Sequence, residues 1–171
     1  MFFLHELEET IPLHPSYFDK DMSVYISNEL HRLVEGKNHG HFFTICVMDS
    51  FEVSEARVLP GTGMAEFTVH YRAIVWRPFR GEVCDGVVNN VLPSGFFVQV
   101  GPLLCFVSRS AIPSEIKFDG NATPPQFTDN ADQVIESGTH IRIKLTGIRS
   151  EVQDMFAIAT IKEDYLGPLM Q

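Results

Sequence analysis

The chain has 171 residues, of which 44% are hydrophobic and 20% are charged, a balance typical of globular domains and not of disordered chains. Its formal net charge of −9 excludes the broad basic field of a free-standing nucleic-acid-binding protein. No apolar run approaches the roughly 20 residues that span a bilayer, and the acidic start is not typical of a signal peptide. We therefore expect a soluble intracellular protein without membrane contact, in which any contact with nucleic acid is local or assisted by a partner.

The residue types that carry catalysis or hold metals show no suggestive spacing. Cys46, Cys84 and Cys105 stand far apart in apolar stretches, which predicts buried free thiols. His39 and His41 lack the second pair of ligands that a structural zinc site needs. No acid pair or Cys–His pair recurs at a spacing that chemistry requires. We expect a protein that is not an enzyme and that holds neither a metal nor a cofactor.

The first half of the chain is predicted to form one helix packed on an antiparallel sheet. A helical stripe of apolar residues ends near Gly36, and a strand alternates from Glu66 to Trp76. The run from Phe42 to Met48 is apolar enough for a strand covered on both faces. In chain order, the expected elements are a strand at 2–7 interrupted at 8–10, a helix from about 19 to 35, and strands at 42–48, 56–59 and 66–76.

The stretch from Arg77 to Val83 is predicted to join two domains. Pro78 has no backbone N–H and disfavours helix at the residue before it, so the strand is expected to end or bend there. Gly81 allows a new strand to start in a changed direction. We therefore place the two domains at 1–79 and 80–171.

The second half is predicted to form a small barrel. Residues 113–132 are rich in Pro, Asn, Asp and Gly, which predicts a long connection after the third strand. Five short strands with such a connection are typical of a Greek-key barrel of the oligonucleotide-binding (OB) type. The expected strands are 81–88, 96–101, 103–108, 139–146 and 155–161. The predicted fold class of the whole chain is thus α+β.

Pleating of the barrel strands predicts a surface for RNA. Phe97 and Phe106 are expected to point outward from neighbouring strands, as a stacking platform for unpaired bases. Arg142 and Lys144 alternate with inward residues on the fourth strand, so they are expected to face solvent and to reach phosphates. The basic residues that extend this stripe are Arg109 and Arg149. The alternative, from spacing alone, is an ordinary solvated strand face.

Two places in the first half are expected to contact another protein. The turn Leu59-Pro60-Gly61-Thr62-Gly63-Met64 carries an apolar pair on a loop tip, and its glycines are expected to need positive φ. Its alternative interpretation is a hairpin loop with no partner. Ile74 and Trp76 make the end of the long strand apolar on both faces, as though something besides its own helix covers it. The nearby Phe79 adds to this apolar stretch.

Particular strings resemble a known family. Gly95–Gly101 followed by Phe106–Ser110 is similar to the S1 RNA-binding motif, although Ser94 and Ser108 stand where that motif has an aromatic residue and a histidine. Nearly end to end, the sequence resembles the stalk subunits of RNA polymerases, a family that includes the seventh subunit of eukaryotic polymerase II and its archaeal counterpart. The strings that carry this wider resemblance are Leu13-His14-Pro15, Val34-Glu35-Gly36, Tyr71–Val83, Ile112–Glu115 and Lys162–Gly167.

The resemblance implies a truncated RNP-like domain at 1–79 that docks on the polymerase core through its tip, and an S1-type OB-fold barrel at 80–171. It implies a non-catalytic stalk subunit that pairs with the fourth subunit and contacts nascent single-stranded RNA. We assign the partner surface to Ile74, Trp76 and Phe79, and core docking to Leu59–Met64. We assign RNA contact to Phe97, Phe106, Ser108, Arg109, Arg142, Lys144 and Arg149.

The resemblance also implies a location in the nucleus, and it leaves a cytoplasmic pool open. Two alternatives remain. One is a free-standing S1-type RNA-binding factor that acts in translation or RNA decay, and the other is the stalk subunit of another nuclear polymerase.

Overall fold

The computed structural model describes residues 1–19, 21–129, 133–151 and 154–169, and it divides into two compact units, 1–77 and 78–171. The division falls two residues before the expected boundary after Phe79, so Phe79 belongs to the second unit. The first unit has one sheet and the second has two, and each unit has its own core.

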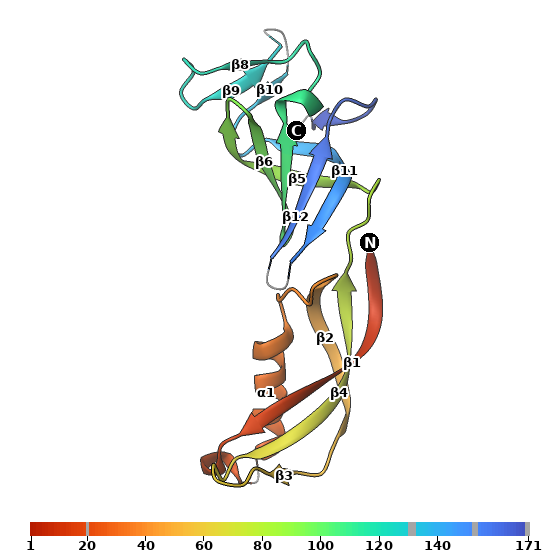
Figure 1. Cartoon of the computed structure of the whole chain (residues 1–171), viewed down its shortest axis with the longest axis vertical. Coiled ribbons are helices and arrows are strands. Elements are labelled where there is room, and N and C mark those ends of the chain that lie inside the picture. Colours follow the sequence, from red (N-terminus) through yellow and green to blue (C-terminus); the bar gives the residue numbers. More distant parts are fainter. Residues whose placement is uncertain (20, 130–132, 152–153, 170–171) are drawn as a thin grey trace. The chain divides into compact units, whose positions relative to one another are not determined.

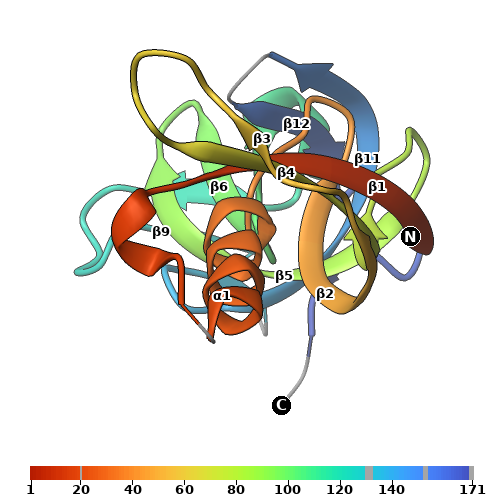
Figure 2. The same cartoon turned by 90° about the horizontal axis from the view of Figure 1, so that it is seen from below.

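The first unit is one helix on an antiparallel sheet, as predicted. The sheet order is β1-β4-β2, with β3 paired to β4. Helix α1 packs on one face of this sheet (Figure 1), and the strands curve around it when the unit is seen from below (Figure 2). The elements are β1 (Phe2–Leu13), a 3-10 turn η1 (Pro15–Tyr17), α1 (Met22–Val34), β2 (Phe43–Val53), β3 (Arg57–Val58) and β4 (Ala65–Trp76).

The core of this unit lies between α1 and the facing side of the sheet. Alternate residues of β4 are buried from Ala65 to Val75, which matches the predicted alternation. They meet Ile26, Leu30 and Val34, which recur at four-residue steps on α1. The same alternation sends Ile74 and the charged residues of β4 to the opposite face of the sheet.

Two expectations about the strands of this unit are wrong. The interruption at 8–10 does not occur, because β1 is an edge strand whose acidic side chains can leave toward water while its backbone pairs with β4 throughout. β2 is not covered on both faces, since Ile45 is 39% and Met48 is 60% exposed. The pairing of β2 with β4 shifts register three times, so some side chains of this edge strand turn outward.

The second unit is a closed five-stranded barrel with a small sheet at one end, shown in Figure 1. The barrel order is β12-β7-β6-β5-β11, and pairing of β11 with β12 closes it. The barrel strands are β5 (Val83–Leu92), β6 (Gly95–Val100), β7 (Leu103–Ser108), β11 (His140–Ser150) and β12 (Met155–Thr160). A 3-10 turn η2 (Arg109–Ala111) follows β7, and β13 (Gly167–Pro168) pairs with β11.

The predicted long connection at 113–132 is wrong in part, because it contains two strands of a second sheet. β8 (Lys117–Asp119), β9 (Gln126–Thr128) and β10 (Val134–Ile135) pair in the order β10-β9-β8. The ring of Phe127 is 1% exposed and lies 5.9 Å, between centroids, from Phe96 of the barrel. This sheet was not predicted, because residues typical of loops dominate its sequence. A few apolar side chains such as Phe127 are enough to pack it on the barrel core.

Candidate nucleic-acid and protein interfaces

The aromatic pair of the barrel stands where the pleating argument places it. Phe97 and Phe106 are directly paired across β6 and β7, half-buried, with ring centroids 4.9 Å apart and planes inclined at 48°. Their neighbours Phe96, Val98 and Val107 are buried inside the barrel, so the predicted outward orientation of the pair is confirmed. The pair therefore offers aromatic surface of the kind on which unstacked bases pack.

Gly95 makes room for this pair. A Cβ atom at Gly95 would lie 2.2 Å from the backbone oxygen of Val107 and 3.0 Å from Cζ of Phe106. Its φ of 146° is also one that residues with side chains rarely adopt. Glycine at the start of β6 therefore allows β7 to approach closely and the Phe106 ring to lie over the strand end.

Strand β12 enlarges the aromatic pair into a wider surface that sequence reasoning missed. β12 runs parallel to β7, with Ile158 beside Phe106 and Phe156 beside Leu104. Phe156 is 46% and Ile158 is 51% exposed. The apolar platform, as defined here, consists of Phe97, Leu104, Phe106, Phe156 and Ile158. The strict alternation of Met155–Thr160 was the signal for it, because that alternation sends Phe156 and Ile158 outward together.

Strand β11 borders the platform on the far side of β12. Arg149 is paired with Phe156, it is exposed, and it has no ion pair with any residue that the structure describes. Lys144 is paired with Thr160, two residues along β12 from Ile158. These two cations therefore flank the platform.

The predicted positive stripe is wrong in one respect, because two of its cations are already neutralised. Arg142 donates to both carboxylate oxygens of Asp85, at 2.6 and 2.8 Å, and this bond lowers the pKa of Asp85. Lys144 Nζ lies 2.6 and 2.9 Å from the two carboxylate oxygens of Glu163. Arg142 also lies away from the platform, between β5 and β13. Sequence could not reveal these pairs, whose members are 57 and 19 residues apart.

The two remaining predicted RNA residues lie at the end of β7. The hydroxyls of Ser108 and Ser110 are within hydrogen-bond distance, at 2.8 Å. Arg109 starts η2, with its backbone N–H donating to the carbonyl of Ser94 and its side chain exposed. Arg109 thus lies where β7 ends and β6 begins. This is the end of the two strands that carry the aromatic pair, but Arg109 is not part of the platform.

The turn at Leu59–Met64, called the tip below, is a tight hairpin that connects β3 to β4. The Leu59 N–H donates to the Met64 carbonyl at 2.8 Å, and Gly61 and Gly63 have φ of 91° and 70°, as expected. Leu59 and Met64 are half-buried and do not form the exposed apolar pair that the sequence suggested. Pro60 and Thr62 are exposed in the same turn.

Exposed apolar surface at this end comes instead from residues beside the turn. Val58 is 63% and Phe18 is 46% exposed, and both line a cleft of about 330 Å³. The cleft is lined mainly by apolar side chains from the start of α1 and from β3 and β4. The tip therefore presents a tight turn with an apolar cleft beside it.

The open face of the first sheet carries an apolar patch at the end opposite the tip. β1 pairs Leu4 with Ile74 and Phe2 with Trp76, so these four side chains share one face. Phe2 is 66% and Leu4 is 59% exposed, whereas Trp76 is only 6% exposed and stacks on Phe43 at 6.1 Å. The sheet patch, as defined here, consists of Phe2, Leu4 and Ile74. Trp76 supports the patch from the strand beside it and offers little surface of its own.

Charged residues continue this face toward the tip. Arg72 donates to both carboxylate oxygens of Asp49, with Nε 3.0 Å from Oδ1, and this bond lowers the pKa of Asp49. Glu6 on β1 is paired with Arg72 on β4, and the carboxylate of Glu8 lies 4.0 Å from the ring of His70. The surroundings of the sheet patch are thus rich in carboxylates.

The remaining predictions concern chemistry and membranes. Among the residues that the structure describes, no three His, Cys, Asp or Glu side chains are grouped as metal ligands. Within the same residues, no helix has the length and apolar character needed to cross a membrane. Of the three cysteines expected to be buried, Cys105 is buried, whereas Cys46 and Cys84 are only partly buried. Burial raises the pKa of Cys105 to about 12, so this thiol is held protonated and inert. Phe79 is 37% exposed in the second unit, with its backbone N–H bonded to the Glu82 carboxylate.

Known proteins resemble the chain over its whole length. The family model described as "SHS2 domain found in N terminus of Rpb7p/Rpc25p/MJ0397" matches residues 8–63, and the model of the "S1 RNA binding domain" matches residues 77–156. "DNA-directed RNA polymerase II subunit rpb7" of Schizosaccharomyces pombe is 50% identical over 98% of this chain and 99% of that protein. The subunit RPB7 of Saccharomyces cerevisiae is 42% identical over 99% of this chain and all of that protein. The subunit RPB7 of Glycine max is 35% identical over 98% of this chain and 96% of that protein.

Proposed function

The chain belongs to the Rpb7 family of DNA-directed RNA polymerase II subunits, and on that basis we propose that it is a stalk subunit of that polymerase whose barrel contacts nascent single-stranded RNA. Three relatives that carry the name of a polymerase II subunit align with nearly the whole chain. This extent favours a polymerase II subunit over a free-standing S1 factor, which would share only the barrel. The identities of 35–50% to these polymerase II subunits favour polymerase II over the stalk of another polymerase.

The observation that carries RNA contact is the apolar platform on the barrel. Phe97 and Phe106 lie side by side with Ile158 next in the row, so three neighbouring strands present one apolar surface. Stacking of a base on an aromatic side chain contributes about 1–3 kcal/mol and does not depend on sequence. Arg149 at the border supplies a cation for a phosphate. We therefore propose weak, poorly selective binding of an unpaired strand.

The net charge of −9 does not prevent such local binding. At physiological ionic strength, charges separated by more than about 8–10 Å are largely screened from each other. Attachment to a polymerase near its exiting transcript would also raise the effective RNA concentration to about the millimolar range. Weak binding is therefore sufficient for contact during transcription.

Two protein interfaces complete the proposal. We assign core docking to the tip, Leu59–Met64, together with the exposed Val58 and Phe18 beside it. We assign the fourth subunit to the sheet patch, because exposed Phe2 and Leu4 form apolar surface that a partner would cover. Phe79 stays a predicted contact of the same partner. The chain would contribute contacts to the enzyme, and not catalysis.

The proposed location is the nucleus, where polymerase II transcribes. A cytoplasmic pool stays a prediction of the family resemblance, because nothing in the fold depends on the compartment. Cell fractionation with the tagged chain would separate the two.

Binding to a short fluorescent single-stranded RNA, measured by anisotropy with the full-length chain, tests the RNA contact. The double substitution Phe97→Ala and Phe106→Ala should weaken binding about tenfold or more, with little change in salt dependence. The matched control is Val83→Ala with Val87→Ala, which removes exposed apolar groups from β5, outside the platform. If the control weakens binding as much as the platform variant does, the assignment of the platform is wrong.

A further inference from the structure

We propose that Glu163 limits RNA binding by holding Lys144, which would otherwise bind a phosphate of the strand lying on the apolar platform. This inference rests on the proposed RNA contact and names the residue that sets its strength. It starts from a difference between the two cations that flank the platform. Arg149 has no ion pair with the described residues, whereas Lys144 is bound to a carboxylate.

Lys144 lies within reach of the platform. It points outward from β11 opposite Thr160 of β12. Thr160 is two residues from Ile158, which corresponds to about 7 Å along a strand. A strand of RNA that covers Phe106 and Ile158 would thus pass between Arg149 at one end and Lys144 at the other.

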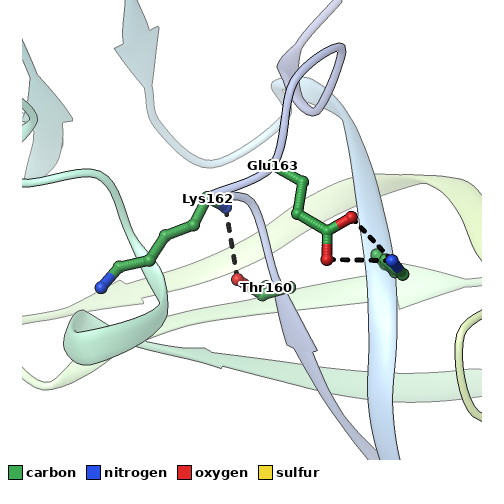
Figure 3. A network of polar contacts seen from close by, with 4 residues as sticks. Thr160, Lys162 and Glu163 are labelled. Atoms are coloured by element: carbon green, nitrogen blue, oxygen red, sulfur yellow. Dashed lines mark hydrogen bonds and ion pairs between the residues drawn. The ribbon is translucent and has the colours of Figure 1, made fainter.

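The carboxylate of Glu163 occupies the place of a phosphate on Lys144. Both of its oxygens lie within 2.9 Å of Lys144 Nζ. The two dashed lines from the Glu163 carboxylate in Figure 3 mark these contacts. The hydroxyl of Thr160 does not compete, because it donates to the Ala111 carbonyl and accepts from the Lys162 N–H. The side chain of Lys162 extends away from Glu163 in the same view, so it leaves the carboxylate to Lys144.

The chain after β12 holds Glu163 in this position. Gly167 and Pro168 pair with β11, and the Leu169 N–H donates to the His140 carbonyl at 2.9 Å. The segment that carries Glu163 is thus held on its N-terminal side by β12 and on its C-terminal side by the pairing of Gly167 and Pro168 with β11. The carboxylate is therefore presented to Lys144 by the fold and not by a free tail.

The pair is weak enough to be opened by RNA, yet it still opposes binding. The Lys144 and Glu163 side chains are 32% and 55% exposed, and exposed ion pairs contribute little net stability because solvent screens them. A phosphate that reaches Lys144 must displace this carboxylate and then stay beside its negative charge. Removing the charge should therefore strengthen binding modestly and add one phosphate contact.

A second ion pair on the same strand provides a matched control. Arg142 and Asp85 form a similarly exposed pair, and Arg142 lies two residues from Lys144 on β11. Arg142 faces β5 and β13, away from β12 and the platform. Glu163→Gln and Asp85→Asn change the net charge equally, but only the first should release a cation at the platform.

The test is anisotropy titration of a short fluorescent single-stranded RNA with the full-length chain at several salt concentrations. We expect Glu163→Gln to tighten binding about two- to fivefold and to steepen the slope of log affinity against log salt by about 0.7. Asp85→Asn should leave both quantities near the parent values. The double variant Lys144→Gln with Glu163→Gln should lose the gain.

Two results would overturn the inference. Equal tightening by Glu163→Gln and Asp85→Asn would show a general effect of net charge, and no tightening by Glu163→Gln would show that Lys144 lies outside the RNA path. The platform variant Phe97→Ala with Phe106→Ala is measured alongside. If that variant still lowers the affinity, the proposed RNA contact stands although the role of Glu163 fails; if it does not, both fail.

Discussion

The sheet patch and the apolar platform are alike in chemistry but differ in their surroundings. Each consists of outward apolar side chains on neighbouring strands. The face of the sheet patch continues into three carboxylates, Glu6, Glu8 and Asp49, against the one guanidinium of Arg72, which is bound to Asp49. The platform is flanked by Arg149, which has no ion pair with the described residues, and by Lys144, whose charge is offset by Glu163. The first border therefore keeps an excess of negative charge and the second keeps the positive charge of Arg149, so a polyanion is repelled by the first and attracted by the second. The difference teaches that the charges at the rim, more than the apolar residues, decide whether such a patch suits a protein or RNA.

The largest expected effect breaks the platform by removing its support. Gly95→Ala should destabilise the barrel by about 3 kcal/mol or more, because the new Cβ would lie 2.2 Å from the Val107 oxygen. Gly101→Ala at the other end of β6 is the control, since its Cβ would meet nothing within 4 Å and only the positive φ opposes it. Denaturant unfolding of both variants measures the difference. Equal destabilisation would mean that the close approach of β7 is unimportant.

The next effect separates the two patches by function. Phe2→Asp with Leu4→Asp should weaken the complex with the fourth subunit tenfold or more, because exposed apolar contacts become charges at a buried interface. RNA affinity of the full-length chain should stay within about twofold of the parent.

The matched variant carries the same charges on the platform. Phe156→Asp with Ile158→Asp should leave the complex intact and abolish RNA binding, through lost apolar surface and repulsion of phosphate. Co-purification of the complex and anisotropy with RNA report the two activities. The comparison fails if either variant impairs both activities equally.

A smaller effect is expected at the tip. Gly61→Val with Gly63→Val places branched side chains at φ of 91° and 70°, at about 1–2 kcal/mol each, although neither Cβ would clash. Binding to polymerase core that lacks this subunit should weaken, while the complex with the fourth subunit persists. Unchanged core binding would remove the tip from the docking surface.

The smallest effect concerns acid stability of the first unit. The Val47 N–H and the His31 ring lie 2.8 and 2.9 Å from the Glu35 carboxylate, and these bonds lower its pKa from the usual 4.5. A carboxyl group whose pKa is lower in the folded state stabilises the fold at any pH above its unfolded-state pKa. This contribution is lost as the pH falls through the folded-state pKa.

Unfolding of Glu35→Gln across pH tests that sign. The variant should cost no more than about 1 kcal/mol at neutral pH, because the side chain is about one-third exposed, and it should lose part of the fall in stability below pH 4.5. If the stability of the variant falls below pH 4.5 as steeply as that of the parent, Glu35 does not contribute to the acid sensitivity of the fold.

Alternation in the sequence was enough to predict the orientation of side chains on single strands. It placed Phe97 and Phe106 outward, and it placed Ile141, Ile143 and Leu145 inside the barrel, as the structure has them. The joint at Pro78 and Gly81 indicated two domains, and the family strings indicated the type of each domain. Both kinds of signal are local, because they depend on residues close together in the chain.

Contacts between distant segments were not predictable in this way. The parallel pairing of β7 with β12 brings Phe156 and Ile158 beside the aromatic pair, although about 50 residues of sequence separate them. The partners of Arg142 and Lys144 depend on the register of β5 and on the course of the chain after β12. The exposure of Val58 beside the tip was not predicted either. Closure of the hairpin partly buries Leu59 and Met64, which the sequence suggested as the exposed pair, and leaves Val58 exposed.

Crosslinking of nascent RNA to this chain within transcribing polymerase II tests the central claim, that the platform contacts the transcript while the first unit supplies protein contacts. Polymerase assembled with Phe97→Ala and Phe106→Ala should contain the subunit at the parent level and should crosslink several-fold less RNA to it. Assembly at the parent level with undiminished crosslinking would contradict the account, and would place transcript contact outside the platform.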